Sequence, residues 1–155
     1  MKWTIISVLV SIPSQSGTLT YNGSAQTPKW QNFDNENSSV SVSAKTNAGE
    51  YTATFTLKKG MWTDGTTAAK TIKWTIGRAT IAAVPAQSGT LTYDGNPKTP
   101  SWNTAYDSAK MTVSVTAATN AGTYSATFTP TSNYKWSDGS TGGKTASWTI
   151  GKAVN

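Results

Sequence analysis

The chain has 155 residues, of which 36% are hydrophobic and only 13% are charged, and its formal net charge is +6. It contains neither cysteine nor histidine, which excludes disulfide bonds, thiolate metal sites, a cysteine nucleophile and the commonest general base. The basic residues are scattered, without the aromatic-interleaved stripe of nucleic-acid grooves, so no nucleic-acid partner is predicted.

The first predicted element is a strand close to the amino terminus. Lys2 and the apolar run from Ile5 to Ile12 resemble a short signal peptide, but the run contains two serines and no clean cleavage site follows it. The string KWTI at 2–5 also recurs at 73–76, inside a segment with strand periodicity. A strand is therefore favoured over a signal peptide, and no stretch is long enough to span a bilayer.

The chain then repeats itself almost from end to end. Such repetition predicts two like units, residues 1–77 and 78–155, each large enough to hold its own core. Only Gly77-Arg78-Ala79 separates the predicted strands at the join, which predicts a short hinge and a fairly fixed end-to-end arrangement. The clearest matching strings are QSGTLTYNG (15–23) with QSGTLTYDG (87–95), TNAGEYTATFT (46–56) with TNAGTYSATFT (119–129), WTDG (62–65) with WSDG (136–139), and WTIGRA (74–79) with WTIGKA (148–153).

Strands are predicted wherever apolar and polar residues alternate, because one face of such a strand is buried and the other is solvated. Glycine-containing turns separate these segments, and no segment has a helical period. Short strands at regular spacing indicate antiparallel sandwiches. The alternating segments are 40–44, 51–57 and 72–76 in the first unit, and 111–117, 124–128 and 146–150 in the second.

The strings NAGEY and NAGTY, each placed before an alternating strand, resemble the tyrosine corner of immunoglobulin-like domains. This resemblance implies that Tyr51 and Tyr124 are structural residues whose hydroxyls return to the backbone. Alanine stands two positions later, where antibody domains carry a cysteine, so the antibody-type disulfide is ruled out. For the central core tryptophan two alternatives remain open, Trp30 with Trp102 or Trp74 with Trp148.

The repeat as a whole resembles the bacterial immunoglobulin-like tandem repeats. These occur in surface proteins of Gram-positive bacteria and in tail or decoration proteins of their phages. The resemblance implies an all-β fold of two tandem immunoglobulin-like antiparallel β-sandwiches. The elements in common are LTY(N/D)G, TNAG-x-Y-x-ATF, W-x-DG and WTIG(K/R)A, and they cover nearly the whole chain.

The seven acidic residues give no sign of catalysis. Only Asp64 and Asp138 are equivalent in the two copies, and each precedes a glycine, as in an ordinary turn. Asp34 and Glu36 lie together in a segment that the second copy does not match, which indicates a solvated loop rather than a catalytic pair. We therefore predict that the protein is not an enzyme and has no metal site or cofactor.

Two long loops, 58–70 and 131–144, hold the candidate ligand-binding residues Trp62, Tyr134 and Trp136. An exposed aromatic ring beside Asp, Asn and Thr side chains stacks well on a sugar. The alternative is that Trp62 and Trp136 fold back and plug the open end of each unit, and their equal placement in the two copies favours the plug. Tyr134 is the better ligand candidate.

The predicted function is structural and adhesive. We expect a phage tail or capsid decoration protein, or a bacterial surface protein, located on the virion or the cell surface. Its predicted partners are other virion or surface-array subunits and cell-surface or mucus glycans, bound multivalently. One alternative is a homo-oligomeric filament or sheath in which the amino-terminal strand completes a neighbour's sheet. Another is an accessory binding module of a carbohydrate-active enzyme.

Overall fold

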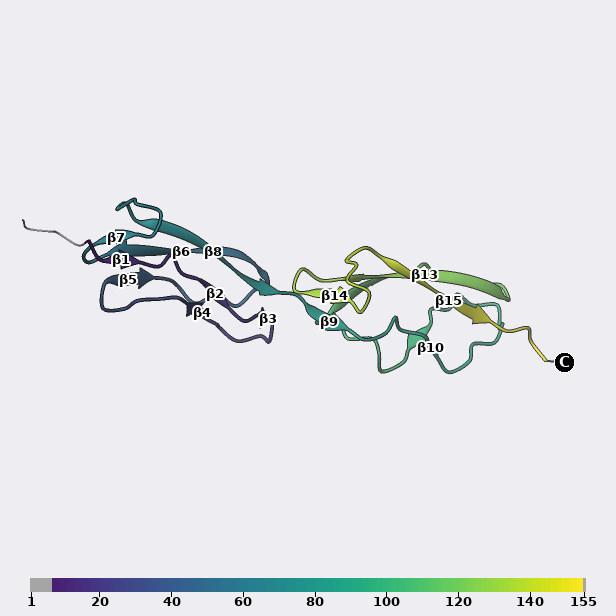
Figure 1. Cartoon of the computed structure of the whole chain (residues 1–155). Coiled ribbons are helices and arrows are strands. Elements are labelled where there is room, and N and C mark those ends of the chain that lie inside the picture. The colour runs from purple at the N-terminus through teal and green to yellow at the C-terminus, as the bar shows by residue number, and fades with distance from the viewer. Residues whose placement is uncertain (1–6, 155) are drawn as a thin grey trace, which may run out of the picture. The chain divides into compact units, whose positions relative to one another are not determined.

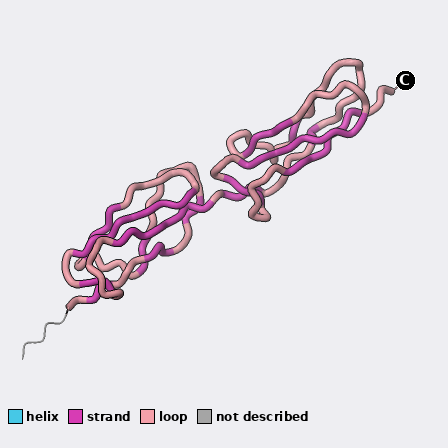
Figure 2. Tube along the Cα trace, turned by 90° about the horizontal axis from the view of Figure 1, so that it is seen from above, coloured by secondary structure: helices cyan, strands magenta, loops and turns pink. Residues whose placement is uncertain are grey.

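A computed structural model describes residues 7–154 of the chain. Over these residues the protein is all-β, with strands joined by turns and loops and with no helix (Figure 2). The chain divides into two compact units, Met1–Gly77 and Arg78–Asn155. No helix in the described part is long and apolar enough to cross a membrane.

The first unit is built around one four-stranded sheet with the order β3-β8-β6-β5 (Figure 1). In this sheet β5, β6 and β8 form an antiparallel meander, and β3 lies parallel to β8. Two short pairs accompany the sheet, β1 parallel to β7 and β2 antiparallel to β4. The strands are β1 (Leu9–Val10), β2 (Ser14–Ser16), β3 (Leu19–Thr20), β4 (Lys29–Gln31), β5 (Ser38–Ser41), β6 (Gly49–Leu57), β7 (Met61–Trp62) and β8 (Lys70–Gly77).

The second unit repeats this plan, with a main sheet of order β12-β13-β15. Short pairs again accompany it, β9 parallel to β14 and β10 antiparallel to β11. The counterpart of β3 is reduced to a parallel bridge between Thr92 and Gly151. The strands are β9 (Ala79–Ile81), β10 (Gln87–Ser88), β11 (Ser101–Trp102), β12 (Met111–Ser114), β13 (Gly122–Pro130), β14 (Tyr134–Trp136) and β15 (Lys144–Ile150).

Alternation along the long strands produces a separate core in each unit. On β6 the apolar residues Ala53 and Phe55 are buried while the threonines that alternate with them are exposed. The Trp30 and Phe33 rings meet the Phe55 ring nearly edge-on, at centroid distances of 4.8 and 5.5 Å. The second unit repeats this cluster, with Trp102 against Phe128 at 4.7 Å. Burial of these aromatic rings stabilises both units.

The chain connection between the first two strands of the meander differs from that in an immunoglobulin constant domain. In such a domain, strands C and F are neighbours in space, but strands D and E separate them in sequence. Here β5 and β6 are neighbours both in space and in sequence. The other pairings between described residues are short. The prediction of an all-β fold is confirmed, and the assignment of the two units to immunoglobulin-like sandwiches stays a prediction.

The predicted amino-terminal strand overlaps only partly with the described residues. Its KWTI portion at 2–5 lies outside them. Within them, Leu9 and Val10 form β1, which runs parallel to β7, and Val10 is fully buried in the core of the first unit.

Candidate binding edge

One edge of the main sheet of the first unit is closed by a glutamine side chain. The Gln15 amide donates to the carbonyl oxygen of Thr75 at 3.0 Å and accepts from the Thr75 N–H at 2.9 Å. A single side chain therefore satisfies both backbone groups of a β8 residue, as a neighbouring strand would. Gln87 does the same for Thr149 in the second unit, at 3.1 and 2.9 Å. This contact explains why the QSG string occurs in both copies.

The opposite edge of the sheet is covered only in part. β5 pairs with residues 54–57 of β6, the last pair being Ser41 with Thr54. The chain then departs, and Lys45 exchanges two backbone hydrogen bonds with Gln26, at 2.8 and 2.9 Å. The strand predicted over 40–44 is therefore wrong at its carboxyl end, because Val42 to Ala44 pass from the main sheet toward the segment that contains Gln26.

The hydrogen-bond parity of β6 shows which backbone groups this departure uncovers. The Lys58 N–H donates to Asn37 O at 2.8 Å, one step beyond the Ser38–Leu57 pair, so even-numbered residues of β6 direct their backbone groups toward β5. Thr75, which lies opposite Glu50, instead bonds to Gln15. The N–H and C=O of Glu50 and Thr52 therefore point away from β8, to a side where no strand among residues 7–154 is paired with them.

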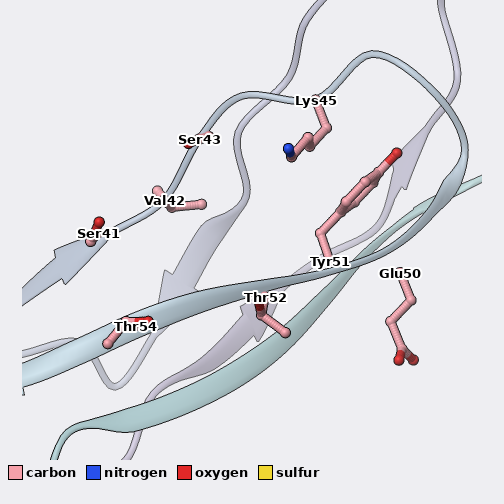
Figure 3. A pocket seen from close by; sticks show the side chains of 8 residues that line it. All are labelled: Ser41, Val42, Ser43, Lys45, Glu50, Tyr51, Thr52 and Thr54. Carbon is pink, nitrogen blue, oxygen red and sulfur yellow. The ribbon is translucent and has the colours of Figure 1, made fainter.

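A polar hollow of about 480 Å³ lies along this uncovered edge (Figure 3). Figure 3 shows Glu50 and Tyr51 leaving β6 on opposite sides, with the departing chain above them. Since consecutive β6 side chains border the hollow, it lies at the strand edge and in the plane of the sheet, where another strand would add. The lining residues are Ser41, Val42, Ser43, Lys45, Glu50, Tyr51, Thr52 and Thr54.

Two charged groups flank the hollow and have different partners. The Glu50 carboxylate accepts from Lys73 Nζ at 2.9 Å on the exposed face of the sheet. This hydrogen bond, together with the attraction between the two charges, raises the pKa of Lys73 above its ordinary value. Lys45 Nζ instead lies 5.5 Å from the centre of the Tyr51 ring, within cation–π range.

The second unit has the same uncovered edge with different side chains. β12 pairs with residues 127–130 of β13, and the chain then leaves to the bridge between Lys98 and Ala118. Thr123 stands where the first unit has Glu50, and Ala118 stands where it has Lys45. The backbone arrangement is therefore duplicated, whereas the carboxylate and the ammonium belong to the first unit.

The expectation that Trp62 and Trp136 bind a ligand is corrected by their burial. Their side chains are 0% and 1% exposed, and each indole N–H donates to a loop carbonyl, of Ala68 or Gly142, at 2.8 Å. Neither ring offers a face to a sugar, so the alternative in which they fold back into the core describes them. Tyr134 is half-buried on β14, opposite Ala79 of β9.

The residues predicted as structural lie in one cluster per unit. The Tyr51 and Tyr124 hydroxyls donate to Asn47 O and Asn120 O at 2.7 Å, which closes the turn before the long strand. Their rings pack on Trp74 and Trp148 at centroid distances of 5.0 and 4.9 Å. Both tryptophans are 1% exposed, while Trp30 and Trp102 are half-buried beside the central phenylalanines, so both pairs take part in the cores.

Acidic residues at equivalent positions of the two copies stabilise turns. Contrary to the expectation from the sequence, Asp34 and Asp107 are also such a pair, since their carboxylates accept from the N–H of Glu36 and of Ala109 at 3.0 and 2.9 Å. Asp64 accepts from the N–H and the hydroxyl of Thr66 and pairs with the Lys70 ammonium. Asp138 makes the equivalent contacts with Ser140 and Lys144. These donors, the lysine first, lower the pKa of Asp64 to about 2 and lower that of Asp138 as well. No cluster of three or more metal-ligating side chains occurs among residues 7–154.

Sequence reasoning did not find Gln15, Gln87 or the backbone of Glu50 and Thr52. The repeated QSG string was the available signal for the two glutamines, but it does not reveal what their amides contact. Comparison of the chain with protein-family models, curated proteins and solved structures finds no match.

Proposed function

We propose that the protein is a non-enzymatic structural and adhesive module whose two units are variant immunoglobulin-like β-sandwiches. The tyrosine hydrogen bonds support the relation to such sandwiches, because both units carry them at the start of the second strand of the meander. The variant feature is the direct succession of β5 and β6, and of β12 and β13, without intervening strands of a second sheet.

The main support for a structural role is that the same stabilising contacts occur in both units. The glutamine clamp, the tyrosine hydrogen bond, the buried loop tryptophan and the aspartate turn all occur in both units. Arg78 alone separates β8 from β9. Repetition of an entire module, rather than of an isolated site, is typical of structural proteins built as tandem arrays. Such a module fits a phage tail or capsid decoration protein or a bacterial surface protein, with other subunits of that assembly as partners.

The exposed sheet faces support the adhesive part of the proposal. In the second unit every outward position of the three main strands is serine or threonine, and no charge interrupts them. Neutral hydroxyls form hydrogen bonds with sugar hydroxyls that are individually weak, so attachment would depend on many copies acting together. These positions are Thr112, Ser114, Thr123, Ser125, Thr127, Thr129, Thr145, Ser147 and Thr149.

Two measurements test this function. Immunogold labelling with an antibody against the chain should decorate the exterior of the native virion or cell that carries it. Chains displayed multivalently on beads should bind neutral glycans on an array, whereas the soluble chain binds them far more weakly. Label confined to the cell interior would contradict the structural role, and equal binding by beads coated with an unrelated protein would contradict the adhesive one.

A further inference from the structure

We propose that the uncovered edge of β6 accepts residues 2–6 of a second copy of this chain as an added antiparallel strand. The inference deepens the structural role proposed above by naming a partner and a contact for it. Strand addition needs three conditions: free backbone groups at a sheet edge, space in the plane of the sheet, and a segment with matching side chains.

The edge meets the first two conditions. By the hydrogen-bond parity of β6, the N–H and C=O groups of Glu50 and Thr52 point away from β8, and both residues line the hollow of about 480 Å³. An uncovered strand edge is a ready template for another strand, and proteins commonly block such edges. This unit blocks the other side of its sheet with β3 and the Gln15 amide, yet it leaves Glu50 and Thr52 without a paired strand among the described residues.

The sequence of residues 2–6 meets the third condition. KWTII at 2–6 closely matches KWTIG at 73–77, and the latter string lies in β8, which pairs with the same stretch of β6. In that pairing Lys73 lies opposite Thr52, and its ammonium reaches the Glu50 carboxylate at 2.9 Å. A KWTI strand in the same register on the uncovered edge places Lys2 opposite Thr52 and within reach of the same carboxylate.

The reach of the chain favours a second copy over pairing within one chain. Val8 is held beside Met61, whose N–H donates to Val8 O at 2.9 Å, and Met61 follows the carboxyl end of β6. In the proposed register Ile6 lies opposite Ala48, nine residues before Leu57, which is about 30 Å along a strand. Two residues, from Val8 to Ile6, extend about 7 Å. The segment of the same chain is therefore too short.

The side chains at the two edges favour the first unit as the acceptor. Glu50 supplies a carboxylate for Lys2, whereas Thr123 at the equivalent place in the second unit does not. The two backbone edges are otherwise alike, which makes residues 122–126 a matched internal control for residues 49–53.

The absence of native cysteine allows a direct test on the full chain. A nitroxide label is attached to the cysteine of a Thr4→Cys variant. This variant is mixed with ¹⁵N-labelled wild-type chain, which has no cysteine and therefore carries no nitroxide. Line broadening is then measured for each backbone amide of the wild-type chain. We expect concentration-dependent broadening centred on residues 49–53 and at least several-fold less at 122–126. Glu50→Gln should reduce the broadening several-fold, and Thr123→Glu should introduce it in the second unit.

Three outcomes would overturn the inference. The first is no broadening between chains at any concentration, and the second is equal broadening in the two units. The third is broadening that appears only when the nitroxide and ¹⁵N are on the same chain and that persists on dilution, which would mean that residues 2–6 pair within their own chain. The proposed function is tested separately, by labelling of the virion or cell surface and by glycan binding. A negative result in the broadening experiment therefore does not contradict that function. A negative result in those tests likewise leaves the contact between residues 2–6 and β6 open to this experiment.

Discussion

At the scale of single residues, the aromatic side chains take part in packing rather than in ligand binding. Trp62 and Trp136 enter the cores from the short strands β7 and β14, and the turn after each one returns a carbonyl to its indole N–H. A buried indole N–H without such a partner would oppose burial of the ring. Each of these two tryptophans is therefore held by the loop that follows it and by the core together.

The first prediction concerns Trp62. Trp62→Ala removes the ring and leaves a cavity beside Val10 and Phe55, so we expect the first unit to lose about 3–5 kcal/mol of unfolding free energy. Urea denaturation followed by circular dichroism measures this loss. Thr63→Ala, at the exposed neighbouring position, is the control and should change stability by no more than about 0.5 kcal/mol. A loss for Trp62→Ala as small as the control's would show that the ring is not part of the core.

The second prediction concerns the acid titration of Asp64. Its pKa is lowered from 3.8 to about 2, mainly by the hydrogen bond from Lys70 and then by those from Thr66. Because the folded pKa lies below the unfolded value, the turn's contribution to stability is present above about pH 4 and is lost as the pH falls through about 2. Carbon-13 NMR of the carboxyl group should give a midpoint near 2.

Lys70→Met provides the control for this titration. It removes the largest cause of the shift, so the Asp64 midpoint should move back toward 3.8 while Asp138 in the second unit keeps its lowered pKa. A wild-type midpoint at the ordinary value would mean that the lysine and threonine contacts are not maintained in solution.

At the scale of elements, the two edges of each main sheet are treated differently. The β8 edge is covered by β3 and by an amide side chain that takes the place of a strand. Along the β6 edge, β5 pairs only with residues 54–57 and then departs. The difference arises because Lys45 pairs with Gln26, which draws the intervening chain out of the main sheet.

The third prediction tests the glutamine clamp. Gln15→Ala leaves the Thr75 N–H without its acceptor, so we expect this amide to exchange with solvent faster and the unit to lose about 1 kcal/mol of stability. Hydrogen exchange measured by NMR reads out each amide separately. Thr149, which is clamped by Gln87, is the control in the same sample and should keep its exchange rate. Unchanged exchange at Thr75 would show that the clamp does not form.

At the scale of the whole molecule, the chain consists of two units with separate cores. One core gathers around Phe55 and the other around Phe128, and each is made of residues from its own unit. Units with independent cores unfold as independent cooperative elements.

The fourth prediction follows from this separation. Phe55→Ala should lower the stability of the first unit by about 3–5 kcal/mol and leave the second unit unchanged, and Phe128→Ala should do the reverse. Denaturant titrations followed by two-dimensional NMR can assign each transition to its unit. A single transition that shifts equally in both variants would mean that the two units unfold together.

The sequence alone determined the features that depend on local order. Alternation along residues 51–57 and 124–128 predicted the long strands, and the NAGEY and NAGTY strings predicted where Tyr51 and Tyr124 would lie. The matching strings predicted two like units. These features are readable because strand periodicity and turn chemistry act between residues that are close together in the chain.

Only the tertiary structure decided the features that depend on distant residues. Gln15 and Thr75 are sixty positions apart, and the departure of the chain after Ser41 depends on Gln26. Likewise, whether Trp62 faces solvent or the core depends on the core residues of β1, β6 and β8 that pack around it, which its own segment does not encode. Such pairings satisfy backbone groups and fill volume between segments that only the fold brings together.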